Sequence, residues 1–86
     1  MDPDYILFVK VAELGSLSAA GRALAISPAM MSKRIARLEA RLGIRLLRRT
    51  TRKLALTDTG GRLYGDIAAI LAAIQEAEDR ATARAT

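Results

Sequence analysis

The sequence predicts a mainly α-helical fold, in which three helices and a two-stranded hairpin are followed by one long helix. Apolar residues recur at helical spacing in four stretches, and glycine, serine or threonine stands where these helices should begin or end. A short segment rich in branched apolar residues lies between the third and fourth stretches. With 86 residues and no cysteine, the chain can form one small domain without disulfides, so helix packing or a partner chain must stabilise it.

The first helix is expected from Asp4 to Leu14. Phe8 and Val11 share its apolar face, and Gly15 follows as a left-handed C-cap. The aspartate in the first turn is favourably placed against the helix dipole.

A second, short helix is expected to start at Ser16 or Ser18 and to run through Ala25. Gly21 lies inside it and costs about 1 kcal/mol relative to alanine, so this helix must depend on its neighbours. Only residues 25–27 separate it from the next helix. Two helices joined by so short a turn cross steeply, as in a helix-turn-helix.

The third helix, from Ser27 to Leu42, has two unlike faces. Ser27 can cap it and Pro28 suits its first position. The residues of its apolar stripe are spaced four, three and four apart: Met31, Ile35, Leu38 and Leu42. The outer face combines small residues with two cations, and a serine lies at its edge: Ala29, Lys33, Ala36, Arg37 and Ala40, with Ser32. This face is either a solvated basic surface or one suited to the major groove of DNA.

After Gly43, the segments Ile44–Arg49 and Lys53–Leu56 predict a two-stranded hairpin, which we call the wing (residues 44–56). Basic residues crowd its tip: Arg48, Arg49, Arg52 and Lys53. Such cations can simply keep an edge strand from pairing. Because a helix-turn-helix directly precedes the wing, we favour a role in contacting phosphates or the minor groove.

A long helix is expected from Asp58 to beyond Glu78, with Thr57 as its N-cap. Its apolar residues repeat with the spacing of a heptad seam: Leu63, Ile67, Ile70, Ile74, Ala77 and Ala81. Near Leu63 the helix is expected to pack on the first helix. Further along, the natural partner of the seam is a second copy of the same helix.

Charge and composition exclude several classes of function. Residues 33–53, the basic segment, hold nine Lys or Arg residues and one acid, whereas residues 58–86 have a net charge of −2. The chain has no histidine and no cysteine, so it lacks the commonest metal ligands and nucleophiles, and we expect neither an enzyme nor a cofactor. The longest apolar run, Ile67–Ile74, has eight residues and is too short to span a membrane. The expected location is the cytoplasm.

The order of these parts resembles a known family. The stretch FVKVAELGSLSAAGRALAISPAMMSKRIARLEARLGIRLLRRTTRKLALTDTG, Phe8 to Gly60, is similar to the N-terminal DNA-binding domain of LysR-type transcriptional regulators. The resemblance implies a winged helix-turn-helix at residues 1–57 and a linker helix for dimerisation at residues 58–86. It also implies that a homodimer binds duplex DNA at an interrupted inverted repeat. Members of this family continue into a larger domain that senses a small-molecule effector, of which these residues contain nothing.

The resemblance also implies roles for individual residues. Base contacts map onto the start of the third helix: Ser27, Pro28, Ala29, Ser32 and Lys33. Backbone contacts map onto Arg34, Arg37, Arg49 and Thr50, with Lys53 in the same basic tip, and the minor-groove arginine maps onto Arg52. Pro28 replaces a common glutamine, and Met30 can add apolar contact to a thymine methyl group. Dimerisation is assigned to Leu63, Ile67, Ile70, Ile74 and Ala77. The alternative is a dimerising protein-interaction module that does not bind specific DNA.

Overall fold

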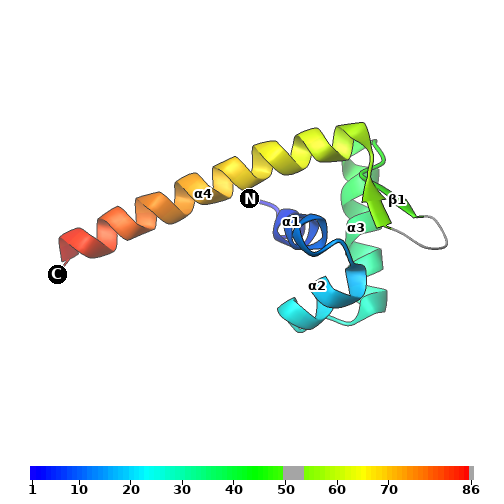
Figure 1. Ribbon diagram of the computed structural model, residues 1–86, viewed down its shortest axis with the longest axis horizontal. Helices are drawn as coiled ribbons and strands as arrows, with labels where there is room; N and C mark the ends of the chain where they lie inside the picture. Colours follow the sequence, from blue (N-terminus) through cyan, green and yellow to red (C-terminus); the bar gives the residue numbers. More distant parts are fainter. Residues whose placement is uncertain (50–53, 86) are drawn as a thin grey trace.

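The computed structural model describes residues 1–49 and 54–85 and confirms the predicted fold class (Figure 1). Its elements are, in chain order, the helices α1 (Asp4–Leu14), α2 (Leu17–Leu24) and α3 (Pro28–Leu42), the strands β1 (Leu47–Arg49) and β2 (Leu54–Leu56), and the helix α4 (Asp58–Ala85). The strands are antiparallel, and Leu47 pairs with Leu56. Figure 1 shows α3, β1 and β2 at one end of the molecule and the free end of α4 at the other.

The helix ends form as their local sequence signals predict. Gly15 and Gly43 end α1 and α3 with left-handed φ angles of 67° and 71°. The hydroxyl of Ser16 accepts the N–H of Ala19, and that of Ser27 accepts the N–H of Met30. Short-range chemistry therefore fixes where the helices begin and end.

The core lies between α1, α2, α3 and the base of the wing. Phe8 and Val11 of α1 are completely buried, as are three residues of the α3 stripe, Met31, Ile35 and Leu38. Leu46 and Leu47, at the start of the wing, complete the same cluster. The apolar stripe of α3 thus holds this helix against the domain and leaves its outer face outside.

Gly21 has a role that its helix propensity does not indicate. A Cβ at this position would lie 2.6 Å from the carbonyl oxygen of Ile26, and the N–H of Ile26 donates to the carbonyl of Gly21 at 2.8 Å. Ala25, between them, has a left-handed φ of 58°. The tight turn between α2 and α3 therefore favours a residue without a side chain at position 21, and the close contact with Ile26 is one of the neighbour contacts on which this helix depends.

The first strand is shorter than predicted, since β1 begins at Leu47 and not at Ile44. The N–H groups of Gly43 and Ile44 donate to the backbone carbonyl of Glu39, and those of Leu46 and Leu47 donate to its carboxylate. These bonds replace strand pairing in the connection that leaves α3. In β2, Leu54 and Leu56 share the half-buried face, as predicted, and Ala55 is exposed.

The first turns of α4 pack against the domain, and the apolar residues further along this helix are exposed. Leu63 packs against the core and Ile67 is only 7% exposed, whereas Ile70 and Ile74 are 46% and 44% exposed. The prediction that the first turns of α4 pack on the first helix is confirmed by the contacts between α1 and α4. Within the described residues, no helix is long and apolar enough to cross a membrane.

Candidate nucleic-acid interface

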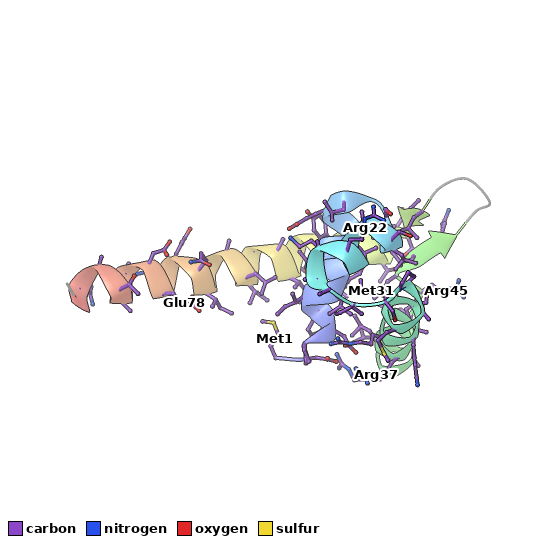
Figure 2. The ribbon with its side chains drawn as sticks, turned by 90° about the horizontal axis from the view of Figure 1, so that it is seen from below. Met1, Arg22, Met31, Arg37, Arg45 and Glu78 are labelled. Carbon is purple, nitrogen blue, oxygen red and sulfur yellow. The ribbon has the colours of Figure 1, made fainter. Side chains whose placement is uncertain are left out.

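The outer face of α3 is open to solvent, and its small residues form a smooth surface. Ala29, Ala36 and Ala40 are exposed along it, together with Lys33, and Ser32 is half-buried at its edge. Figure 2 shows Arg37 and Arg45 on different sides of this helix. A helix with short side chains along its outer face can approach the edges of base pairs closely, while its flanking cations face phosphates.

The leading end of α3 offers few side-chain donors to bases. Ser27, Pro28 and Ala29 are all exposed; Pro28 and Ala29 have no polar side-chain atom, and Ser27, whose oxygen accepts the Met30 N–H at 3.2 Å as the N-cap, keeps one O–H donor. Met30 itself is 45% exposed and apolar. The polar atoms that this face presents to a base therefore come mainly from Ser32 and Lys33.

A buried carboxylate binds two of the arginines that the resemblance assigns to the DNA backbone. Asp4, at the start of α1, is 1% exposed, and its oxygens accept from the Nε of Arg34 at 2.7 Å and from Arg37 at 2.8 Å. Burial disfavours the charged form of Asp4, but the hydrogen bonds and positive charges of Arg37 and Arg34 outweigh it and lower the pKa of Asp4. Arg34 is 21% exposed and Arg37 is 65% exposed, so Arg37 keeps a surface for a second partner.

Arg41, the next arginine of α3, also forms hydrogen bonds with side chains near the N-terminus. Arg41 donates to Asp2 at 3.2 Å and to the hydroxyl of Tyr5 at 3.0 Å, and its guanidinium lies 5.5 Å from the centre of the Tyr5 ring. The acidic N-terminus therefore offsets the charge on one side of α3. Lys33 and Arg45 line the opposite side, which faces the wing.

That opposite side forms a shallow hollow of about 420 Å³ between α3 and β1. Ser32, Lys33, Ala36, Glu39, Arg45 and Leu47 line it. Arg45 is 77% exposed and its Nε lies 3.8 Å from the carboxylate of Glu39. Arg48, in β1, is also exposed. Arg45 was not among the predicted contacts, because the sequence did not indicate which cations of the basic segment face the groove beside α3.

The structure does not describe the side chains of four residues for which DNA contacts are predicted. Thr50, Arg52 and Lys53 lie outside the described residues, as does the side chain of Arg49. Their roles remain predictions from the resemblance.

A comparison with known protein families identifies the family to which this chain belongs. The family model for bacterial regulatory helix-turn-helix proteins of the LysR family matches residues 4–61. The chain belongs to the LysR family. The match covers α1, α2, α3, the wing and the start of α4, which are the elements that build the outer face and the hollow.

Curated relatives of this LysR-family chain are transcriptional regulators. The probable HTH-type transcriptional regulator LtrA of Klebsiella pneumoniae is 43% identical over 84 residues, which is 98% of this chain and 27% of LtrA. The HTH-type transcriptional regulator PtxR of Pseudomonas aeruginosa is 53% identical over 58 residues, 67% of this chain and 19% of PtxR. The chain thus spans about a quarter of the length of such relatives or less.

Two similar solved structures are DNA complexes. The CbnR DBD–DNA complex superimposes with a TM-score of 0.82 at 34% identity, over 96% of this chain and 95% of that chain. The complex of the BenM DBD with catB site 1 DNA gives a TM-score of 0.88 at 29% identity, over 96% and 93%. The likeness includes α4 and is not confined to the helix-turn-helix.

Proposed function

We propose that this LysR-family domain binds duplex DNA in a sequence-specific manner as part of a transcriptional regulator. The main support is the exposed outer face of α3, which has small residues and lies beside a hollow lined by Lys33 and Arg45. The fold that presents this face is similar to those in the CbnR and BenM DNA complexes. A bacterial regulator of this kind would act in the cytoplasm.

The outer face of α3 would enter the major groove. Ser32 and Lys33 would make most of the polar base contacts, and Ser27, Pro28 and Ala29 would fit the groove by shape. Arg37, on one side of α3, and Arg45, on the other, would contact the phosphates that border the groove. Arg34, which is largely covered and bound to Asp4, would instead support Arg37. The residues of the wing predicted to add phosphate and minor-groove contacts are Arg49, Thr50, Arg52 and Lys53.

Two copies would pair through the part of α4 that leaves the domain. Ile70 and Ile74 are exposed apolar residues and Ala77 continues their seam, whereas Ile67 is already covered within the chain. This seam lies away from α3 (Figure 1), so pairing would leave both α3 outer faces open for successive major grooves. The target would be an interrupted inverted repeat. In the longer relatives' architecture, an effector would act through a domain beyond these residues.

Binding measurements on point variants test these roles. Ser32→Ala or Lys33→Ala should reduce discrimination between a target and its single-base variants, with a loss of about 1–3 kcal/mol per lost contact. Arg37→Ala should weaken all duplexes to a similar degree. A result in which Ser32→Ala and Lys33→Ala leave the base preference intact would contradict the proposed docking of α3.

Sedimentation separates the proposal from a module whose only task is dimerisation. Ile74→Lys should shift the chain to monomer and also remove tight binding to an inverted repeat. If the wild type forms dimers but binds no duplex above background, the interaction-module alternative is correct.

A further inference from the structure

One residue of α3, Glu39, holds the connection to the wing. Its backbone carbonyl accepts the N–H groups of Gly43 at 2.8 Å and Ile44 at 3.2 Å. Its side-chain Oε2 accepts the N–H groups of Leu46 at 2.7 Å and Leu47 at 3.3 Å. The side chain is only 17% exposed, so this carboxylate is directed at the backbone and away from solvent.

The same stretch is held from the opposite direction by the start of α4. The N–H of Thr57 donates to the carbonyl of Leu46 at 3.0 Å, and the Thr57 hydroxyl donates to the carbonyl of Arg45 at 2.6 Å. Gly60 packs so closely on the Leu46 carbonyl that a Cβ there would overlap it. Leu46 is therefore held at its N–H by α3 and at its carbonyl by α4.

We propose that Glu39 is a positioning residue that sets the orientation of β1 and β2 with respect to α3, and with it the preference for base pairs that flank the half-site. The inference rests on the proposed function. Among the described residues, each strand of the wing has three paired residues, and so short a hairpin does not hold its own direction. Its direction therefore depends on the packing of Leu47, Leu54 and Leu56 against the core and on its base, where an ionised carboxylate makes stronger hydrogen bonds than a neutral acceptor.

A purely electrostatic role for Glu39 predicts a different behaviour. Its carboxylate, although directed at the backbone, borders the hollow that Arg45 and Lys33 also line, and its negative charge opposes theirs. If this were its only effect, neutralising it would tighten binding to every duplex by the same factor. The positioning role instead changes the ratio between the affinities for different duplexes.

The experiment uses the full chain and three duplexes: the preferred inverted repeat, a version with changed flanking base pairs, and a version with one changed half-site base pair. Dissociation constants are measured by fluorescence anisotropy for the wild type, Glu39→Ala, Glu39→Gln and the control Glu13→Gln. Glu13 is an exposed residue of α1 that pairs with Lys10, so its variant removes the same charge away from the wing. Amide hydrogen exchange by NMR reports the N–H groups of Leu46 and Leu47 in the same samples.

In Glu39→Ala we expect the Leu46 and Leu47 amides to exchange about tenfold faster or more, while the amides of Ile35 and Leu38 stay protected. The preference for the correct flank should fall by about threefold or more, and the half-site preference should stay within about twofold. Glu39→Gln keeps one acceptor oxygen and should lie between the wild type and Glu39→Ala. It also provides the test if the alanine variant does not fold.

Two outcomes overturn the inference alone: equal loss of flank and half-site preference, or unchanged ratios despite released amides. A wild type without any sequence preference contradicts the proposed function, and the inference with it. A wild type that prefers the half-site but not the flank contradicts only the inference.

Discussion

The buried carboxylate of Asp4 offers a quantitative test of how α1 supports α3. Asp4→Asn keeps the shape of the side chain and removes its charge. The native carboxylate is 1% exposed and accepts from Arg34 at 2.7 Å and from Arg37 at 2.8 Å. Removing one partner of a buried ion pair costs about 3–5 kcal/mol, because the other charge is left unpaired.

The cost for this protein should lie below that range. The amide oxygen of asparagine still accepts one hydrogen bond, worth about 1 kcal/mol, and Arg37 is exposed enough to be hydrated. We therefore expect the free energy of unfolding to fall by about 2–3 kcal/mol at pH 7, and the melting temperature to fall by about 10 °C or more. Urea and thermal unfolding followed by circular dichroism, at one fixed protein concentration, measure both quantities.

The pH dependence identifies the charge as the cause. The pKa of Asp4 is lowered in the folded state, so its contribution is complete above the unfolded pKa of about 3.9 and is lost as the pH falls through the lowered folded value. The difference between wild type and Asp4→Asn should therefore shrink below about pH 4. Asp58→Asn, in the first turn of α4, is the control for the helix dipole and should cost about 0.3–1 kcal/mol. Equal stability of wild type and Asp4→Asn at pH 7, or a difference that does not shrink in acid, would show that the ionised carboxylate of Asp4 does not stabilise the fold.

Three further predictions concern the backbone and the hollow. Gly60→Ala should destabilise the domain by about 1–3 kcal/mol, because its Cβ would overlap the Leu46 carbonyl, whereas Gly61→Ala has open space and should stabilise α4 by about 0.5–1 kcal/mol in chemical denaturation. Ala25→Gly should raise the melting temperature, because the left-handed φ of 58° costs an alanine about 1 kcal/mol; a lower melting temperature would contradict this. Arg45→Ala should reduce the salt dependence of DNA binding by about one phosphate contact, and the distant control Arg80→Ala should leave it unchanged.

The helices were predictable because their signals are local. Gly15 and Gly43 cap α1 and α3, Ser27 and Pro28 start α3, and all four act within one turn of the helix they bound. These signals gave the bounds of α1 without error and those of α3 within one residue. The same reasoning separated the buried stripe of α3 from its outer face, because the period of a helix is fixed.

The remaining features depend on contacts between residues far apart in the chain. Asp4 lies 30 residues from Arg34, so the sequence indicated only its place near a helix dipole and not the ion pairs that hold α3. The first strand was predicted too long, since apolar composition does not reveal that Glu39 binds the backbone N–H groups of residues 43, 44, 46 and 47. Arg45 was missed for the same reason, because its exposure beside α3 follows from that connection.

Selection of duplexes from a random pool by the purified chain, at two salt concentrations, tests whether two copies of the domain bind duplex DNA through the outer face of α3 and the wing. We expect an interrupted inverted repeat whose half-sites are about one helical turn apart, centre to centre, or a multiple of that. Affinity for it should fall steeply as salt rises, with a slope that reports several phosphate contacts. Recovery of unrelated duplexes without a shared repeat, or binding that is independent of salt, would contradict this mode of binding.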